Sequence, residues 1–275
     1  MAITRDIFNL SGKLGNVIYY KRNGQQCARS ASEKVKISEE SIKSGTEFGR
    51  ASNAGRLVRT VFGRIIKNMT DNGLGNRLNT KFFKVINTGP VAIKGERQVT
   101  DGDLDLLRGF ELNRDSSLSN LMYFIPKTRI EAPDKINFSI SEFEVRHSFK
   151  APESATTIVV QIGCGVFDFP AKCGYTLWAD DIVLSFDGKN FEGGSIDFPL
   201  DNTEGKVLIT CAGIYFRNSF GGMIKNKDYQ AGELLDVVLI RDGKIVKFQY
   251  PEPVKPVVDP DDPLQSISWN FGKQG

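Results

Sequence analysis

Helical and strand-like patterns occupy separate parts of this chain of 275 residues. From about residue 127 onward, Val, Ile, Phe and Tyr dominate short segments that Gly, Asp, Asn and Pro interrupt. Because no helix-length segment alternates with these strands, a doubly wound α/β fold is disfavoured. Short strands at regular intervals are typical of an antiparallel β-sandwich. We therefore predict an α+β protein whose sandwich spans residues 127–250, with strands in KINFSI, TTIVVQIGCGVFDF, IVLSF, KVLITCAGIYF, LLDVVLI and KIVKFQY.

A segment near the start of the chain, GKLGNVIYYKRNGQQCARS, predicts a β-hairpin. The Asn-Gly pair between its arms favours a type I′ turn, which requires positive φ at both central positions. Pairing across this turn places Arg22 opposite Gln25. It also places Tyr20 opposite Cys27. Because a two-stranded ribbon is marginally stable in water, we expect the hairpin to pack on the protein's own body or on a neighbour.

A second hairpin is predicted in the β-rich part. The segment LIRDGKIV has an Asp-Gly pair, Asp242–Gly243, between two strand-like arms. This pair is one of the preferred two-residue hairpin connections.

A long amphipathic helix is predicted to follow the first hairpin. Ser38 is a suitable N-cap residue, and the acidic residues after it favour the first helical turn. The pair Asn72–Gly73 provides a stop signal. Apolar residues recur between these limits at spacings of three and four, which predicts one buried stripe: Phe48, Ala51, Gly55, Val58, Phe62, Ile65 and Met69.

This predicted helix is rich in small residues. Each interior Gly costs about 1 kcal/mol relative to Ala, so several of them need a compensating reason. We expect that reason to be close approach of another backbone, from the hairpin, from the second helix or from another copy of the chain. The small residues are Gly45, Gly49, Ala51, Ser52, Ala54, Gly55 and Gly63.

Two shorter helices complete the N-terminal part. The segment RLNTKFFKVIN has helical periodicity and ends before Gly89–Pro90. A further short helix is predicted at 103–108, with Thr100 or Asp101 as its cap. We therefore assign residues 1–110 to one basic module that consists of the hairpin and the helices.

The net charge of +3 hides an asymmetry along the chain. Residues 1–98 contain 18 Lys and Arg against 7 Asp and Glu, whereas residues 99–275 contain 18 against 26. Such polarity suits head-to-tail contact between identical subunits, which generates rings or open filaments; the alternative is that the two halves neutralise each other within a monomer. A basic half that carries tyrosines also suits nucleic acid. The candidate contact residues for a protein or nucleic-acid partner are Lys13, Tyr19, Tyr20, Lys21, Arg22, Arg29, Arg56, Arg64 and Lys67.

The C-terminal segment combines a stiff spacer with a strand. Residues 251–263, PEPVKPVVDPDDP, predict an extended Pro-rich linker. In residues 264–275, Ile267, Trp269 and Phe271 alternate with polar residues, which is strand periodicity. We expect this docking strand to add to a sheet edge of another subunit, with its aromatic side chains in pockets. The alternative is that it folds back onto its own sandwich.

The residues that could carry catalysis form no recognisable set. His147 alternates with Val145 and Phe149 in a strand-like stretch, and no nucleophile motif accompanies it. The adjacent acids Asp180–Asp181 and Asp261–Asp262 are typical of solvated turns. No glycine run is followed by the Lys and Ser or Thr of a phosphate-binding loop. We therefore predict that the protein is not an enzyme and has no catalytic residues and no cofactor.

The four cysteines are expected to be free and buried. No CxxC pair is present, and the one histidine cannot complete a common zinc set, so we predict no metal site. Cys164 and Cys211 lie in apolar strand-like runs, where cysteine behaves as a small hydrophobe. Cys27 and Cys173 are assigned in the same way, and a Cys164–Cys173 disulfide is the alternative.

The segments SGKLGNVIYYKRNG, with Arg29 after it, and EFGRASNAGRLVR resemble the N-terminal region of an uncharacterised Bacteroidota protein family with an SGKxGNVxYYxRNG hairpin. The β-rich segments GYTLWADDIVLSF and GKVLITCAGIYF are similar in rhythm to that family's C-terminal portion. The resemblance implies a hairpin, helices and a β-sandwich. It brings no activity and no site residues.

These observations favour a non-enzymatic structural or interaction protein. We expect it to self-assemble, or to dock into a larger particle, filament or phage-like assembly, as a homo-oligomer or with an acidic protein partner. The runner-up is a nucleic-acid-binding protein that uses the basic N-terminal half. No apolar leader begins the sequence and no apolar run reaches membrane-spanning length, so we expect synthesis in the cytoplasm without membrane insertion, and a place in a released particle is left open.

Overall fold

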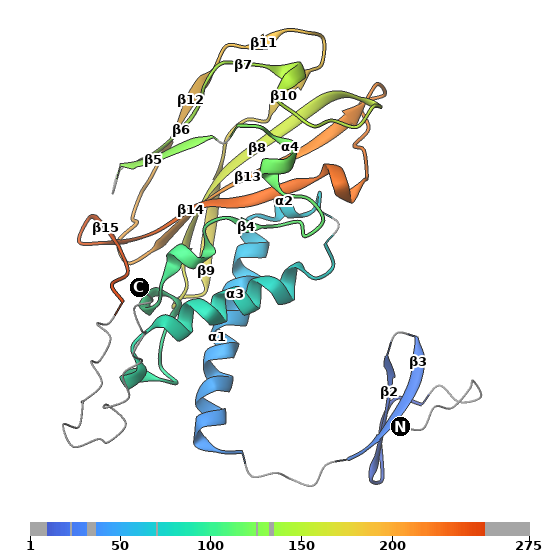
Figure 1. Ribbon diagram of the computed structural model, residues 1–275. Helices are drawn as coiled ribbons and strands as arrows, with labels where there is room; N and C mark the ends of the chain where they lie inside the picture. Colours follow the sequence, from blue (N-terminus) through green and yellow to red (C-terminus); the bar gives the residue numbers. More distant parts are fainter. Residues whose placement is uncertain are drawn as a thin grey trace, which may run out of the picture. The chain divides into compact units, whose positions relative to one another are not determined.

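The chain forms two compact units, Met1–Thr46 and Glu47–Gly275 (Figure 1). The first contains a small antiparallel sheet, and the second contains most of the helical residues and the other sheets. The predicted linker 251–263 and docking strand 264–275 lie outside the described residues. The computed structural model describes residues 10–22, 24–31, 37–69, 71–124, 126–131 and 135–250.

The N-terminal sheet confirms the predicted hairpin register and adds a strand. Tyr20 pairs with Cys27, and Arg22 pairs with Gln25. Gly24 has a φ of +78°, the positive value that its turn position requires. The added strand was not predicted because three residues are too few to show periodicity. In sheet order, the strands are β1 (Gly12–Leu14), β2 (Val17–Arg22) and β3 (Gln25–Ser30).

The helices are mostly short. The α-helices are α1 (Glu39–Val61), α2 (Gly63–Ile66), α3 (Leu74–Thr88) and α4 (Leu118–Leu121). The 3₁₀ helices are η1 (Val91–Ile93), η2 (Val99–Asp101), η3 (Leu104–Leu107), η4 (Val145–His147) and η5 (Lys227–Tyr229). No helix within the described ranges is both long enough and apolar enough to cross a bilayer.

The long helix begins where the sequence predicts but ends early. The Ser38 hydroxyl accepts a hydrogen bond from the Ser41 N–H at 3.2 Å, which confirms the N-cap. The predicted end at Asn72–Gly73 is wrong, because α1 ends at Val61. There the Val61 carbonyl accepts a 2.7 Å hydrogen bond from the Thr176 hydroxyl. Gly63, a poor helix former, follows the break directly, so a local signal accompanies this distant contact.

The predicted apolar stripe continues through the break and is largely buried. Val58, Phe62 and Ile65 are completely buried. Phe48 is an exception, because 48% of it is exposed while its ring packs edge-on against Phe83. The stripe therefore marks the core-facing side of α1 and α2 correctly.

Close approach of the second helix explains one of the small residues in α1. A methyl group added at Gly55 would collide with the Asn79 side chain of α3. By contrast, Gly45, Gly49 and Gly63 have no atom within 4 Å of the position of an added Cβ. The close-packing prediction is therefore confirmed at Gly55, and packing in the structure does not explain the other three glycines.

The second unit is organised around one large antiparallel sheet. Its central order is β10-β8-β13-β14-β15, while β9 pairs with β8 and β4 pairs with β14. The predicted Asp242–Gly243 turn connects β14 to β15, with φ of +51° and +66°. The strands are β4 (Phe110–Glu111), β8 (Ala155–Asp168), β9 (Cys173–Trp178), β10 (Ile182–Ser185), β13 (Val207–Asn218), β14 (Ala231–Arg241) and β15 (Lys244–Val246).

The two faces of this large sheet carry different layers (Figure 1). Along β13, Ile209 and Cys211 face a core that contains the helices, whereas Leu208 and Ile214 face a core that contains a smaller sheet. The fold is therefore α+β with packed antiparallel sheets, as predicted, and the helices share a core with the large sheet. The smaller sheet has the order β12-β6-β5, from β12 (Gly194–Pro199), β6 (Lys135–Ile140) and β5 (Lys127–Glu131), and a separate pair is formed by β7 (Phe143–Glu144) and β11 (Asn190–Phe191).

Glycines in the large sheet let the helices come close to it. A Cβ at Gly213 would lie 2.5 Å from the Ile65 side chain. A Cβ at Gly165 would lie 2.5 Å from the Phe167 ring and 2.9 Å from the Phe62 ring. Because these glycines have no side chain, Phe62 and Ile65 of the helical segment can pack directly on the sheet.

Three local predictions need correction. The stretch around His147 is a 3₁₀ helix, not a strand. The helix predicted at 103–108 is the 3₁₀ helix η3, and neither Thr100 nor Asp101 caps it. Its N-cap is Asp103, whose side chain accepts a hydrogen bond from the Asp105 N–H at 3.0 Å. The strands β5, β9 and β12 were not predicted, because their exposed positions carry few of the apolar residues that mark a strand.

Candidate functional site

The predicted contact residues in the N-terminal sheet divide between its two faces. Residues paired across antiparallel strands lie on the same face, and neighbours along a strand lie on opposite faces. Tyr19 and Lys21 therefore share one face with Leu14 and Val17. We call the opposite face the basic face; it consists of Lys13, Ile18, Tyr20, Arg22, Cys27 and Arg29.

The basic face is chemically suited to an anionic or aromatic partner. Ile18, Tyr20 and Arg29 line a shallow hollow of about 380 Å³. Within the described part of the chain, no carboxylate pairs with Lys13, Arg22 or Arg29.

The N-terminal sheet buries few side chains, as far as its described residues show. Among its described residues, Cys27 is the one buried side chain. Val17 and Tyr19 on one face, and Ile18 and Tyr20 on the other, are half-buried. A sheet becomes independently stable when three or more strands share a hydrophobic face or when it packs against a helix, and the apolar side chains here are divided between both faces.

The predicted helix residues Arg64 and Lys67 come together at a second place, within the second unit. They lie on α2 and just after it, where the helix ends and leaves part of the large sheet uncovered. The hollow there has a volume of about 450 Å³. We call it the α2 hollow; it is also lined by Asn68, Gln161, Asp181, Tyr215 and Arg217. Arg56 is exposed on α1 and does not line it.

Hydrogen bonds hold the floor of the α2 hollow in place. The Arg64 guanidinium donates to the Asp181 carboxylate at 2.9 Å and lies 5.3 Å from the centre of the Trp178 ring. Gln161, which is 4% exposed, donates to the same carboxylate at 3.1 Å. It accepts a 3.1 Å hydrogen bond from the Asn68 side-chain amide. This polar network is internally satisfied.

Arg217 was missed by the sequence analysis. It lies in the anionic half of the chain, so charge counting did not select it. It is two residues after Tyr215, and its guanidinium donates to the Tyr215 hydroxyl at 2.9 Å. The alternation along β13 places both on the helix-covered face of the sheet. Their meeting with Lys67 depends on where α2 ends, and only the tertiary structure decides that.

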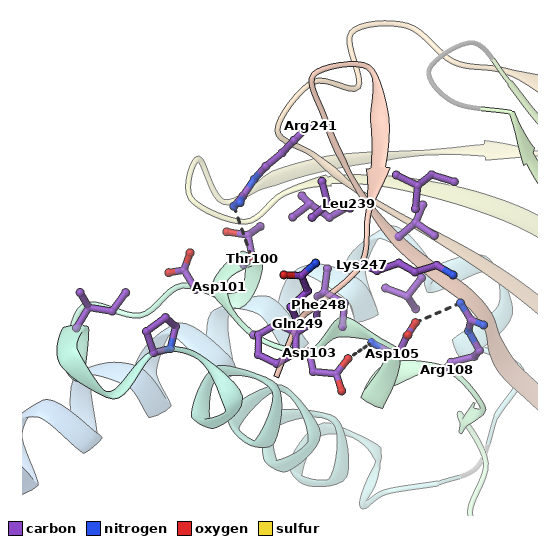
Figure 2. A pocket seen from close by; sticks show the side chains of 18 residues that line it. Thr100, Asp101, Asp103, Asp105, Arg108, Leu239, Arg241, Lys247, Phe248 and Gln249 are labelled. Atoms are coloured by element: carbon purple, nitrogen blue, oxygen red, sulfur yellow. Dashed lines mark hydrogen bonds and ion pairs between the residues drawn. The ribbon is translucent and has the colours of Figure 1, made fainter. Parts of the chain in front are cut away.

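A further hollow, with a volume of about 630 Å³, lies beside the edge strand β15 (Figure 2). We call it the β15 groove. Apolar side chains of Leu104, Leu239 and Val246 line it on both sides. Polar residues surround them; Arg108 and Asp105 form a 3.2 Å ion pair, and the Arg241 guanidinium donates to the Thr100 carbonyl at 3.5 Å. The sequence analysis did not identify this groove.

The last described residues cross the β15 groove. Phe248 lines it, and its ring packs edge-on against Tyr250, with centroids 5.0 Å apart. The Tyr250 hydroxyl donates a hydrogen bond to the Asp103 carboxylate, and this bond raises the pKa of Tyr250. The described chain thus ends at the rim of the groove.

The candidate chemical residues remain separate from one another. His147 is exposed, and its Nδ1 lies 3.1 Å from the Glu144 carboxylate. Across the described ranges, no three His, Cys, Asp or Glu residues gather as metal ligands. Asp181 belongs to the α2 hollow, where it pairs with Arg64.

All four cysteines are free. Cys27, Cys164 and Cys211 are buried, as predicted. Burial raises the pKa of Cys164 to about 12 and raises that of Cys211 as well. Cys173 is exposed, so the prediction of burial is wrong there; it begins β9, opposite Asp168 at the end of β8.

No protein-family model and no curated protein matches the chain. Among solved structures, it is similar to "Bacteroides uniformis beta-glucuronidase 2 covalently bound to cyclophellitol-6-carboxylate aziridine", at 16% identity and a TM-score of 0.22. The similarity covers 41% of this chain and 12% of that one. At this TM-score it supports no conclusion about fold or activity.

Proposed function

We propose that this chain is a non-enzymatic structural protein that self-assembles, or docks into a larger particle, filament or phage-like assembly. The observation that carries the proposal is the N-terminal sheet, which forms part of a separate compact unit and has one buried side chain among its described residues. A sheet of three strands with half-exposed Val17, Ile18 and Tyr20 gains stability when another surface covers it. An assembly provides such a surface.

Charge indicates which surface suits the basic face. Lys13, Arg22 and Arg29 favour an acidic partner, because opposite potentials across an interface steer association and fix its register. Residues 99–275 of a second copy carry an excess of acidic side chains. In a head-to-tail contact, the acidic part of one copy would therefore compensate the charge of the basic face on the next copy, and no different protein is needed.

The docking strand 264–275 is the second part of the proposed assembly contact. We place its acceptor at the β15 groove of another copy. β15 is an end strand of the large sheet, so its outer backbone groups have no partner strand among the described residues. An added strand would pair with this edge, and its Trp269 and Phe271 would occupy the apolar groove.

The linker has the length for this role. Its thirteen residues, 251–263, span about 40 Å at roughly 3.1 Å per residue in the polyproline II conformation. The linker starts directly after Tyr250, at the groove of its own copy. A linker of this length would allow the docking strand to pair with the groove of a neighbouring copy. If instead the strand fills its own groove, the protein is a monomer.

Light scattering at low and high salt tests these contacts. We expect a large species that becomes smaller when the chain ends at Tyr250. Val246→Asp, in the groove, should have the same effect, whereas Val183→Asp, at an exposed position of β10, should not; the two valines are 39% and 51% exposed. A monomer in every condition would overturn self-assembly. If the large species persists after truncation at Tyr250, the proposed role of the docking strand is wrong. If truncation removes the large species but Val246→Asp does not, the β15 groove is not the acceptor.

The alternative function is nucleic-acid binding through the basic face. It is favoured by the position of Tyr20, a stacking side chain, beside Arg22 and Arg29. Arg29→Gln should weaken binding and reduce the salt slope by about 1, because one phosphate contact is lost. Lys21→Gln removes the same charge from the opposite face and should have a smaller effect. If the protein binds no oligonucleotide at low salt, this alternative is wrong.

A further inference from the structure

The α2 hollow has an excess of positive charge at a fixed position. Three cationic side chains line it, from Arg64, Lys67 and Arg217, against the carboxylate of Asp181. That carboxylate is already paired with Arg64 at 2.9 Å. Within the described ranges, Lys67 and Arg217 have no carboxylate partner. The hollow therefore has two uncompensated positive charges.

Arg217 is the most informative of these residues. It is half-buried, and removing a charged group from water is costly unless a partner compensates for the loss. The Arg217 guanidinium donates a 2.9 Å hydrogen bond to the Tyr215 hydroxyl and lies 5.5 Å from the centre of the Tyr215 ring. A neutral hydroxyl and an aromatic face orient the guanidinium but do not neutralise it.

Contacts within the protein orient both guanidinium groups of the hollow. Asp181 and the Trp178 ring hold the Arg64 guanidinium, and Tyr215 holds that of Arg217. The buried Gln161 fixes the floor through hydrogen bonds on both ends of its amide. Preorganisation of this kind reduces the entropy that binding costs.

We propose that the α2 hollow binds a phosphate group. Guanidinium groups present planar pairs of donors that match phosphate oxygens, and Lys67 adds a mobile point charge at the rim. A volume of about 450 Å³ admits a phosphate with a small organic group attached. The phosphate belongs either to a small molecule or to a nucleic-acid backbone, which present the same oxyanion. This site is independent of the assembly contacts, because it uses neither the basic face nor the β15 groove.

Isothermal titration calorimetry with pyrophosphate and with inorganic phosphate, at low chloride concentration, tests the site. We expect the full chain to bind pyrophosphate, and Arg217→Gln to weaken binding about tenfold or more, the loss expected for a charge-assisted contact. Arg129→Gln is the matched control, because Arg129 is 80% exposed on β5 and does not line the hollow. It should change the affinity less than twofold.

Two further measurements make the test decisive. Lys67→Gln changes an exposed side chain, so it should fold normally and still weaken binding even if Arg217→Gln is unstable. Titration with a short single-stranded oligonucleotide distinguishes the sources. If it binds more tightly than pyrophosphate and Arg217→Gln weakens it, the phosphate is that of a nucleic acid; if only pyrophosphate binds, it is that of a small molecule. Absence of pyrophosphate binding, or equal weakening by Arg129→Gln, would overturn the proposal.

Discussion

The buried ion pair between Glu47 and Arg97 allows a quantitative test of how the second unit is held together. The side chains are 1% and 5% exposed, and two hydrogen bonds of 2.6 and 2.7 Å join them. The Gly95 N–H donates a third bond to the same carboxylate at 2.7 Å. Arg97 also donates to carbonyl and amide oxygens of Asn87 and to the Gly89 carbonyl. Every N–H of the guanidinium therefore has an acceptor.

Replacing Glu47 with Gln should destabilise the protein strongly. The substitution leaves the Arg97 charge buried without its counter-charge, and breaking a buried pair in this way costs about 3–5 kcal/mol. With a urea m-value of about 2–3 kcal/mol/M, the midpoint should fall by about 1–2.5 M. Equilibrium urea unfolding, followed by tryptophan fluorescence, measures this shift.

The pH dependence gives an independent check of the same pair. The hydrogen bonds from Arg97 hold the pKa of Glu47 below its usual value. A carboxylate with a lowered folded pKa stabilises the protein above its unfolded pKa, and this contribution disappears as the pH falls through the folded value. Wild type should therefore lose stability below about pH 4.5, the range of an ordinary Glu, more steeply than Glu47→Gln does.

The matched control is the exposed pair of Arg129 and Glu131, 3.3 Å apart. Removing it with Arg129→Gln should cost less than about 1 kcal/mol, because solvent screens exposed pairs. Equal shifts for Arg129→Gln and Glu47→Gln would refute the reasoning, since burial would then have no effect on the cost.

Two further predictions concern packing and thiol reactivity. Gly213→Ala should destabilise the protein by about 1–3 kcal/mol in urea unfolding, because the added methyl overlaps Ile65; Gly49→Ala, in open space on α1, should be neutral or stabilising by up to about 1 kcal/mol. A thiol reagent at pH 8 should modify the exposed Cys173 of the folded protein and reach Cys164 after unfolding; rapid native labelling of both would contradict the assigned burial.

Much of the fold was predictable because local rules dictate it. The Asn-Gly pair determined the register of the first hairpin, and Asp242–Gly243 determined that of the second. The apolar stripe of α1 and α2 identified their buried side, apart from Phe48. Strands with continuous apolar runs, such as β8 and β13, were recognisable because both of their faces are covered.

The candidate sites were less predictable, because residues distant in sequence form them. Arg64 and Lys67 were selected for their charge, but their neighbour Arg217 lies in the acidic half of the chain. The β15 groove is formed by 3₁₀ turns and an edge strand that lie more than 130 residues apart in sequence, so the local patterns that predict them do not bring them together. Charge alone also placed Lys21 and Arg22 in one predicted contact surface, although the two side chains lie on opposite faces of β2.

By itself, the sequence determined the class of fold, the hairpin registers and the core-facing side of the main helix. These depend on turn geometry and on the periodicity of apolar residues, which act over a few neighbouring positions. Only the tertiary structure brings the Thr176 hydroxyl of a distant strand to the Val61 carbonyl, where α1 ends. The helical cover of the large sheet ends at Ile66, the last residue of α2, and Lys67 lies there in the same hollow as Arg217. Contacts of this kind depend on packing between distant segments, which no local pattern encodes.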